Sequence, residues 1–443
     1  MLSDFNVRWS TPAIGGMLTC FVFLASCALL LGHMSLNQTL TQPPEIGGDA
    51  VDYDWIAWGL STGNGFYRVP PTDEFLAPYL SSHQVIPYIT TGEPATDRPP
   101  LYPLLLATTF RAGRQFQVIR IVQAVLMAMV TAAISKRVFA LAGLIPALLC
   151  PGLMLVVDPR PRIMVREILT EDVSCYLVVV LFFALLVWRH RNTFWSSAIV
   201  GGVLGGLILC RTMMVFWVPV LAVGMWTLGS RENRVRLAGQ IVLCGLVAVA
   251  LCLPWWMRNV DVLGELRPLG TQGAEQMSAA YSDQAFARKG MWGNIDEAGF
   301  FESIDEEDPI KRSLARARLS EQTAMTWIKK HPLKSAVLPI LRVLQEFRPH
   351  GPADLFVLAF SCLGLAVVWR TSEGKIAAWI ILAQVLAIAA TWSVAGRFVY
   401  PLLGVMHLLA AIGVWGAYVA IIERRDLTRS WVLSDRAKAK QPG

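Results

Sequence analysis

The sequence predicts an all-α polytopic integral membrane protein, a bundle of about ten transmembrane helices. Of its 443 residues, 54% are hydrophobic and only 16% are charged, and the mean hydropathy is +0.48. Charged residues alone make up about a quarter of an ordinary soluble domain. Apolar stretches of roughly the 20 residues that a spanning helix requires also recur along the chain. These observations exclude an ordinary soluble fold.

The expected spans place the basic loops on one side of the membrane. The spans are residues 13–33, 117–135, 138–156, 171–188, 195–211, 213–229, 236–255, 354–370, 376–394 and 398–422. When the N-terminus is placed in the cytoplasm, the Lys and Arg clusters between spans fall on the cytoplasmic side, as the positive-inside rule requires. Both termini are then cytoplasmic, and we expect a multi-pass protein of the inner (plasma) membrane.

This topology divides the chain into four parts and puts two long polar segments on the outer side. The parts are an N-terminal membrane module (1–255) with its first outer loop (34–116), an outer insert (256–353), C-terminal spans (354–425) and a basic cytoplasmic tail (426–443). Within the insert, surface helices are expected over residues 313–330 and from Pro332 to about Phe347.

Several function classes lose support because their residue patterns do not occur. The eight cysteines lie in or beside apolar segments without paired spacing, so we interpret them as small core residues. No two histidines share a ligand spacing, and no structural zinc site is expected. The chain has no phosphate-binding loop, dinucleotide fingerprint or nucleophile elbow. The net charge of +7 is scattered over loops and the tail, so nucleic-acid binding is not expected.

The first outer loop is expected to hold a site rather than to act as a connector. Asp49, Asp52, Tyr53, Ile56 and Leu60 recur at the spacing of one helical face, which puts Asp49 and Tyr53 one turn apart. An isolated aspartate is most often a solvated loop acid. Three acids beside one tyrosine at a membrane surface favour a functional role for Asp49.

A second helix is expected later in the same loop. Pro99 and Pro100 fix the backbone at the start of a short helix over residues 101–110, while Gly63 and Gly65 end the first helix. Ten residues cannot span a membrane, so we expect this second helix to lie in the membrane interface.

Arginines on the predicted outer side suggest a phosphate ligand. Ten arginines lie near the outer ends of the spans, and no lysine lies among them. They are Arg98, Arg111, Arg114, Arg120, Arg160, Arg162, Arg166, Arg211, Arg258 and Arg397. The planar guanidinium pairs bidentately with phosphate, and lipid headgroups are the simpler ligand. Arg211 stands out because it occupies a tight turn between two spans, where a charge at depth costs about 2.5 to 3.5 kcal/mol.

Glu171, at the head of the fourth span, has two interpretations. In the first, Thr170 caps the helix and Glu171 complements the helix dipole in the first turn. In the second, Glu171 is a functional acid at the outer face. The sequence leaves both open.

Six short motifs occur along the chain in a characteristic order. They are an acid four residues before a tyrosine (Asp49, Tyr53), Asp97-Arg98-Pro-Pro-Leu-Tyr102-Pro, Thr170-Glu171, Arg211, Pro254-Trp-Trp-Met-Arg258-Asn259 and Arg397-Phe-Val-Tyr400-Pro. In their order along the chain and in their shared position on the outer side, these motifs resemble those of the GT-C glycosyltransferases of the protein O-mannosyltransferase-like and aminoarabinose-transferase-like group. The resemblance covers most of the chain.

The resemblance implies an enzyme and assigns roles to these residues. Such enzymes move a sugar from a polyprenyl-phosphate carrier to an acceptor at the outer face, usually with inversion. By this resemblance, Asp49 would match the catalytic aspartate. The residues that would bind the donor and its phosphate are Asp97, Arg98, Arg211, Arg258, Asn259 and Arg397. The supporting residues would be Tyr53, Tyr102 and Glu171.

We therefore expect a membrane glycosyltransferase that transfers a hexosyl or pentosyl group to a lipid, glycan or protein acceptor. No cofactor is required by this chemistry, although the oxygen ligands of Asp49, Asp97 and Glu171 leave a shared divalent metal open. One alternative is a lipid or glycolipid transporter, which should show paired half-repeats or spans broken at the membrane midplane. Another is a structural partner in an envelope complex, which gives no reason for acids and arginines to converge. The enzyme predicts that Asp49, Arg98, Glu171, Arg211 and Arg258 surround one cavity.

Overall fold

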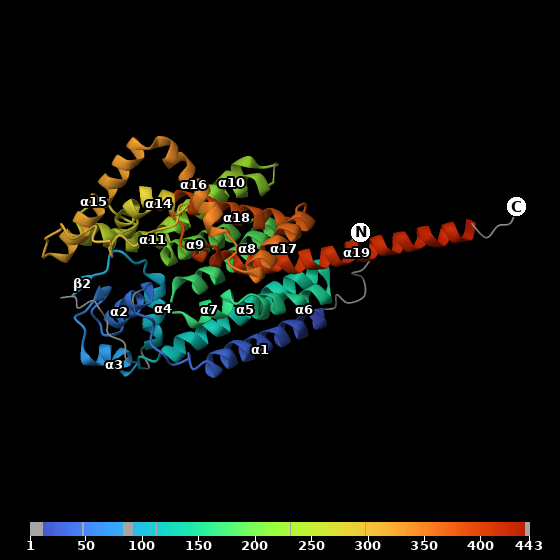
Figure 1. The fold of residues 1–443 in the computed structure, drawn as a ribbon, viewed down its shortest axis with the longest axis horizontal. Helices are drawn as coiled ribbons and strands as arrows, with labels where there is room; N and C mark the ends of the chain where they lie inside the picture. Colours follow the sequence, from blue (N-terminus) through green and yellow to red (C-terminus); the bar gives the residue numbers. More distant parts are fainter. Residues whose placement is uncertain are drawn as a thin grey trace.

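Helices run along nearly the whole chain, as the sequence predicts. The structure is a computed structural model and describes residues 12–46, 48–82, 92–110, 113–230, 232–296 and 298–438, with side chains for all of these except residues 12 and 423–438. Across those ranges the only strands are β1 (Tyr67–Arg68) and β2 (Glu93–Pro94), which pair antiparallel in the first outer loop. The long helices lie side by side along the longest axis of the molecule (Figure 1). The prediction of an all-α polytopic membrane protein is confirmed.

Six helical segments in the described part of the chain are long and apolar enough to cross a membrane. They belong to α1 (Pro12–Leu36), α5 (Phe116–Ala142), α8 (Thr170–Arg191), α11 (Arg234–Leu263), α18 (Ser372–Ala390) and the joined helices η3 (Arg397–Leu402) and α19 (Leu403–Lys438). Three further expected spans coincide with shorter apolar helices: α9 (Phe194–Cys210), η2 (Thr212–Phe216) with α10 (Trp217–Leu228), and α17 (Pro352–Val368).

The third expected span differs from its prediction. We expected it over residues 138–156, but α5 continues to Ala142 and Gly143 adopts φ of 93° before a new helix begins. This new helix consists of α6 (Leu144–Gly152) and η1 (Leu153–Val157). A bend of 63° then leads into α7 (Arg160–Arg166), so the segment is either a broken span or a re-entrant loop.

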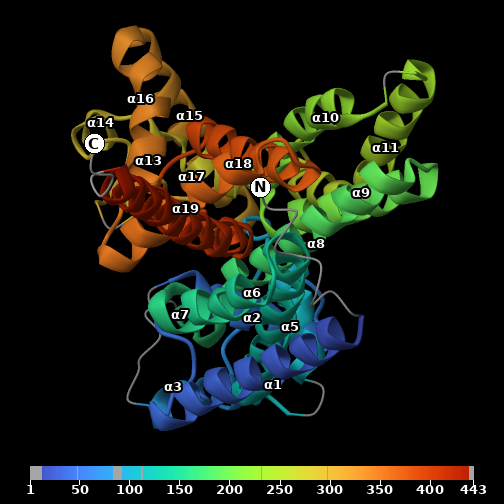
Figure 2. The ribbon, with the colours of Figure 1, turned by 90° about the vertical axis from the view of Figure 1, so that its right-hand side faces the viewer.

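Helix α8 lies at the centre of the bundle. It contacts α5, α9, α18, α19 and η3. Viewed along the long axis, α9, α10 and α11 project to one side of it, while α15 to α19 and the N-terminal helices α1 to α7 form two other groups (Figure 2). The residue at the head of α8 therefore lies where three parts of the chain meet.

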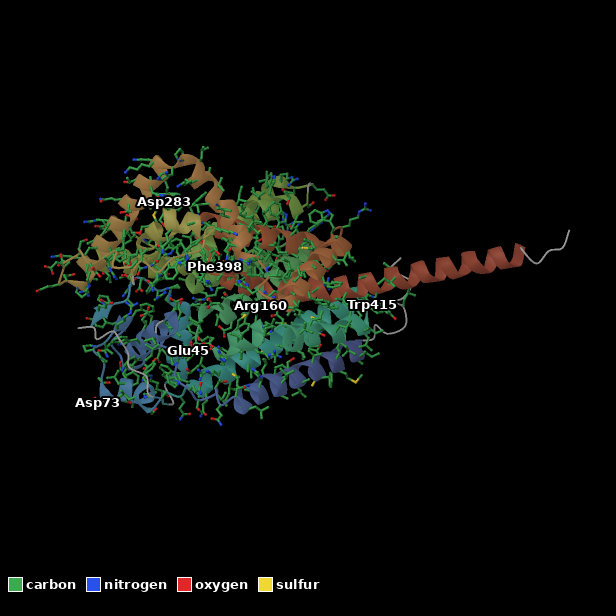
Figure 3. The ribbon with its side chains drawn as sticks, viewed as in Figure 1. Glu45, Asp73, Arg160, Asp283, Phe398 and Trp415 are labelled. Atoms are coloured by element: carbon green, nitrogen blue, oxygen red, sulfur yellow. The ribbon has the colours of Figure 1, made fainter. Side chains whose placement is uncertain are left out.

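The polar elements gather at one end of the bundle, the end that holds Asp73 and Asp283 (Figure 3). From the first loop come α2 (Asp49–Ser61), α3 (Asp73–Ser81) and α4 (Leu101–Phe110). From the insert come α12 (Gln272–Glu275), α13 (Met277–Ala280), α14 (Asp283–Ala287), α15 (Pro309–Lys330) and α16 (Pro332–Glu346). The predicted helices at Asp49 and Pro332 are confirmed, and α15 begins four residues earlier than expected because Asp308 caps it ahead of Pro309.

Helix α4 is packed inside the protein to a greater extent than an interfacial helix would be. Tyr102 and Leu106 on this helix are fully buried. The Tyr102 hydroxyl donates to Gln123 Oε1 of α5 at 3.0 Å, and α4 also contacts α2. One face of α4 is therefore part of the core that carries α2.

Two glycines bring α17 and α19 into backbone contact. A Cβ on Gly364 of α17 would overlap the Leu409 carbonyl oxygen of α19, and a Cβ on Gly413 of α19 would overlap the Phe360 carbonyl oxygen of α17. Small residues allow membrane helices to approach this closely. Ser361 adds a hydrogen bond to the Met406 carbonyl at 2.8 Å. The contact fixes α19, whose N-terminal extension is η3.

This contact predicts that Gly364→Ala destabilises the bundle. The added methyl group must push the two helices apart, and such overpacking costs about 1 to 3 kcal/mol. We expect a lower thermal unfolding temperature for the purified protein in detergent. Gly245→Ala is the matched control, because nothing lies within 4 Å of a Cβ at that position of α11. Equal unfolding temperatures for the two variants would show that the glycine contact does not matter.

Candidate active site

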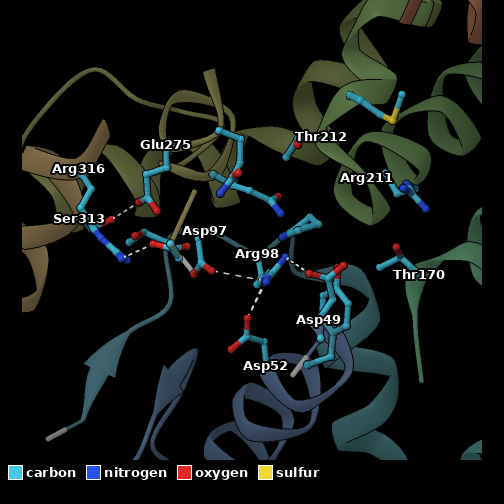
Figure 4. A pocket seen from close by; sticks show the side chains of 18 of the residues that line it. Asp49, Asp52, Asp97, Arg98, Thr170, Arg211, Thr212, Glu275, Ser313 and Arg316 are labelled. Carbon is cyan, nitrogen blue, oxygen red and sulfur yellow. Dashed lines mark hydrogen bonds and ion pairs between the residues drawn. The ribbon is translucent and has the colours of Figure 1, made fainter. Parts of the chain in front are cut away.

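A cavity of about 640 Å³ opens where the first outer loop, the insert and the ends of the bundle helices meet (Figure 4). Of the residues predicted to form the site, those that line this cavity are Asp49, Tyr53, Asp97, Arg98, Arg211 and Arg397. They come from the first loop, the turn after α9 and the start of η3. The structure therefore brings together residues that are hundreds of positions apart in the sequence.

Arg98 joins two of the three acids of α2 to Asp97. Its guanidinium lies 2.8 Å from Asp49, 2.6 Å from Asp52 and 3.4 Å from Asp97. The helical face predicted from the spacing of Asp49, Asp52 and Tyr53 is what turns both acids toward Arg98, and the Arg98 guanidinium also lies 5.7 Å from the centre of the Tyr53 ring. Asp52 is therefore a part of the site, although the sequence favours only Asp49.

Arg68 forms a second charged group beside the first. It lies on β1 and pairs with Asp97 at 2.8 Å, Glu93 at 3.2 Å and Asp52 at 3.4 Å. Arg68 and Glu93 line the cavity but were missed from the sequence. Their pairing depends on the register of β1 and β2. Strands of only two residues leave no pattern in the sequence from which this register could be predicted.

Arg397 joins the first loop to the bundle. It donates from Nη2 to Asp49 at 2.9 Å and from Nε to Glu171 Oε1 at 2.5 Å. Glu171 Oε1 also lies 3.0 Å from Arg211 Nη1, but this ion pair lacks the alignment of a hydrogen bond. Within the described structure, Arg211 Nη1 and Glu171 Oε2 have no hydrogen-bond partner. Arg211 is therefore anchored on Glu171 by an ion pair alone, while its side chain lines the cavity.

Glu171 lies behind the cavity wall, with 2% of its surface exposed. It supports Arg211 and Arg397 from below rather than facing the cavity itself. The expectation that Thr170 caps α8 is wrong, because Leu169 occupies the cap position and no side chain caps this helix. Of the two interpretations of Glu171, the pairing with arginines therefore matches the structure better than capping.

The arginines determine the protonation of the acids in the first loop. Burial would raise the pKa of Asp49, but the Arg98 and Arg397 guanidinium groups outweigh it and hold that pKa well below its usual range. Arg68 and Arg98 likewise lower the pKa of Asp97 against the effect of burial. Both carboxylates are therefore ionised at neutral pH. Burial and the Asp49 charge raise the pKa of Tyr53, which keeps its hydroxyl protonated.

Arg258 and Asn259 do not line the cavity, which corrects the expectation that Arg258 borders it. Arg258 donates to the carbonyls of Phe66 at 2.9 Å and Ala95 at 2.6 Å, while Asn259 donates to the Pro268 carbonyl at 3.0 Å. The Arg258 bonds hold the two strand segments of the first loop against α11 from outside the cavity, and the Asn259 bond holds the start of the insert.

Tyr102 is also outside the cavity wall. Its ring lies 5.3 Å from that of Tyr53 in an edge-to-face arrangement, on the side of Tyr53 that belongs to the core. It supports the position of Tyr53 and, through it, of α2.

Several of the outer arginines have structural partners. Arg114 pairs with fully buried Asp54, and Arg160 pairs with fully buried Asp158. Arg111 lies outside the described residues. The arginine pattern that suggests phosphate binding therefore has its clearest candidates in the cavity itself.

The insert contributes a wall that the sequence did not assign. Glu275 of α12 lies in this wall and accepts a hydrogen bond from the Ser313 hydroxyl of α15 at 2.7 Å. Burial, followed by the nearby Asp97 charge, raises the pKa of Glu275. Trp292 also lines the cavity here, and its indole nitrogen donates to Gln276 at 2.6 Å.

The three acids that could share a divalent metal do not form a ligand set. Among the described side chains, no group of three or more His, Cys, Asp or Glu residues is arranged to hold an ion. Arg98 lies between Asp49 and Asp97, and Arg397 lies between Asp49 and Glu171. The chemistry proposed below uses no step through a metal.

Comparison with known proteins supports the fold. No protein-family model and no curated protein sequence matches the chain. The archaeal oligosaccharyltransferase AglB from Archaeoglobus fulgidus, in complex with an inhibitory peptide and a dolichol-phosphate, is similar with a TM-score of 0.51 and 14% identity, over 93% of this chain and 52% of that one. The Archaeoglobus fulgidus enzyme tethered to an acceptor peptide gives a TM-score of 0.50 and 13% identity, over 95% and 51%.

This chain thus spans about half the length of those two proteins. ArnT from Cupriavidus metallidurans, bound to undecaprenyl phosphate, gives a TM-score of 0.40 and 12% identity, over 91% of this chain and 77% of that one. The likeness to the oligosaccharyltransferase confirms the GT-C-like bundle that the resemblance implies.

The charge network predicts a pH-dependent loss of stability in Arg98→Met. In the wild type, the lowered pKa values of Asp49 and Asp97 give stability that is complete above the unfolded value of about 3.9 and is lost only as the pH falls below it. Without Arg98 the buried carboxylates bind protons more readily in the folded state. We therefore expect the variant to unfold at a lower temperature at pH 8 than at pH 5, whereas the wild type changes little over this range.

Thermal unfolding in detergent at both pH values measures this difference. Arg267→Met is the control, because Arg267 pairs with Glu265 and Glu321, two acids that do not line the cavity. The same pH dependence in both variants would mean that the cavity network has no special effect on the carboxylates.

Proposed function

We propose that the protein is a membrane glycosyltransferase that moves a sugar from a polyprenyl-phosphate carrier to a hydroxyl group of an acceptor at the outer face, with inversion at the anomeric carbon. The observation that carries this proposal is the arrangement of Arg211 and Arg397 beside Asp49 in one cavity. The GT-C-like fold supports it.

Arg211 and Arg397 are the proposed site for the carrier phosphate. Both guanidinium groups pair with the same buried carboxylate, Glu171, and both side chains line the cavity. Guanidinium groups bind phosphate oxygens through two parallel hydrogen bonds. In transfer, the phosphate gains negative charge as it leaves the sugar, and cations already in place stabilise that charge.

Asp49 is the proposed base for the acceptor. Its carboxylate is ionised and shares Arg397 with Glu171. We propose that the donor phosphate draws Arg397 toward itself, which frees one side of Asp49 to accept a hydrogen bond from the acceptor hydroxyl. When Arg397 moves away, the proton affinity of the Asp49 carboxylate also rises, and Asp49 becomes a stronger base for the acceptor hydroxyl.

The bond changes then balance without a nucleotide. The acceptor oxygen forms a bond to the anomeric carbon, the bond from that carbon to the phosphate oxygen breaks, and the acceptor proton passes to Asp49. Polyprenyl phosphate leaves with the electron pair and is held by the arginines. Attack from the face opposite the leaving phosphate inverts the anomeric carbon.

The remaining predicted residues have supporting roles in this proposal. Arg98 holds Asp49, the Tyr53 ring faces Arg98, and Asp97 balances the Arg98 charge. Arg258 holds the first loop from outside the cavity rather than binding the donor, and Asn259 holds the start of the insert. Transport of a lipid or glycolipid is less well supported, because the acids and arginines of the site converge on one cavity.

The proposal predicts that Asp49→Asn lowers sugar transfer by about a hundredfold or more, the usual contribution of a general base. The measurement is transfer from radiolabelled polyprenyl-phosphate sugars in membranes that contain each variant. Asp283→Asn is the control, because Asp283 is an exposed acid that pairs with Lys334 away from the cavity. Equal transfer by wild type and Asp49→Asn would remove Asp49 from the reaction.

Arg397→Lys tests the phosphate site. Lysine keeps the charge but cannot bridge two carboxylates and a phosphate with a planar fork. We expect the KM for the donor to rise about tenfold, since a bond between charged groups of this kind contributes roughly that factor. Arg318→Lys, at an exposed pair with Glu265, should leave the KM unchanged. A donor KM that does not change in Arg397→Lys would place the phosphate elsewhere.

A further inference from the structure

The segment that carries Arg397 is a thin wall between two cavities. Trp392, Val394 and Phe398 line the main cavity on one side. Gly396 and Tyr400 line a second cavity of about 420 Å³ on the other side. Packing of η3 against α8 holds one side of this segment, while the two cavities leave other parts of it without packing partners. Something else must fix the direction in which Arg397 points.

The backbone of the same segment adopts an unfavourable conformation. Ala395 has φ of 49° and Gly396 has φ of 90°. The left-handed region is rare for an alanine, so the surroundings must impose it. Pairing with the insert supplies part of this constraint, since Trp292 donates its backbone N–H to the Ser393 carbonyl at 2.8 Å.

Glu346, the last residue of α16, supplies the rest. Its carboxylate accepts the Ser393 hydroxyl at 2.6 Å and the Val394 backbone N–H at 2.8 Å through Oε2, and the Phe398 backbone N–H through Oε1. The side chain is 1% exposed and has no ion pair with any described residue. Burying a carboxylate without a cation is costly, and three donors from one short segment compensate for that cost.

Arg342 fixes the helix that presents Glu346. It lies one turn earlier on α16, is fully buried, and donates to the Ala389 carbonyl at 3.0 Å and the Ala280 carbonyl at 2.8 Å. Ala389 lies in the last turn of α18, from which the Arg397 segment departs. Arg342 therefore holds α16, and with it Glu346, against the end of α18 at which that segment begins.

We propose that Glu346 is a positioning residue for Arg397. By holding residues 393–398, it sets the guanidinium between Asp49 and Glu171, where it meets the carrier phosphate. This inference rests on the proposed function of Arg397. It also gives the insert a role in the reaction, because α16 belongs to the insert while the phosphate site belongs to the bundle.

Glu346→Gln is the variant that tests it. The amide has one accepting oxygen, so it cannot serve both the Phe398 N–H and the Ser393 and Val394 donors. We expect the donor KM of the full-length protein to rise about tenfold, with the thermal unfolding temperature near that of the control. Glu373→Gln is that control, because Glu373 is a buried acid paired with Arg137 at the opposite end of α18. An unchanged donor KM in Glu346→Gln overturns the inference.

A double-mutant cycle separates positioning from general support. In an Arg397→Ala background, Glu346→Gln should change the donor KM no further, because its effect passes through Arg397. Fully additive effects overturn the inference. Should Glu346→Gln not accumulate as folded protein, Ser393→Ala removes a single bond, and we expect the same pattern with about a threefold effect.

Amide hydrogen exchange gives a measurement that does not depend on the reaction. In Glu346→Gln the amides of Val394 and Phe398 should exchange about tenfold faster than in the wild type, and those in Glu373→Gln should not change. If the wild-type protein transfers no sugar from any polyprenyl-phosphate donor, the proposed function fails. Hydrogen exchange then still tests whether Glu346 holds residues 393–398. Unchanged exchange at both amides would show that Glu346 does not hold this segment.

Discussion

The two bonds of Arg397, one to Asp49 and one to Glu171, are the interaction on which the rest of the site depends. Charges near the end of a membrane bundle are costly unless each has a partner. Arg397 provides a partner for one acid from the first loop and one from the head of α8. The first loop is thereby attached to the bundle, and its acids are kept ionised inside the cavity.

The fold is arranged around the supports of that bridge. Helix α8 lies at the centre of the bundle and presents Glu171, and the close contact of α17 with α19 fixes the helix that follows η3. The first loop is held against α11 by Arg258 and closed on its other side by Arg98. The insert then reaches across the cavity and holds the Arg397 segment through Glu346. Four regions of the chain therefore determine the position of one guanidinium group.

The sequence was sufficient where the signal is local. Apolar length predicts the long helices, and the spacing of Asp49, Asp52 and Tyr53 predicts both α2 and the face that it turns to the cavity. The boundary near Gly143 was misplaced because hydropathy does not change there, while the backbone does. Thr170 has the side chain of a cap, but the helix begins at Thr170 itself, one residue earlier than it would if Thr170 were the cap.

Pairing between distant segments could not be predicted from the sequence, because it does not depend on a local pattern. Arg258 and Arg397 are both arginines near the outer ends of spans, yet one donates to backbone carbonyls and the other to carboxylates. Composition does not distinguish them, because the difference lies in what the neighbouring chain presents. Glu346 gives no signal at all, since a glutamate at the end of an amphipathic helix is usually solvated. Because the arginines are shared among acids, a lipid headgroup that offers only a phosphate must compete with carboxylates already in place. The site therefore favours a ligand that gains binding energy from its sugar and its chain as well.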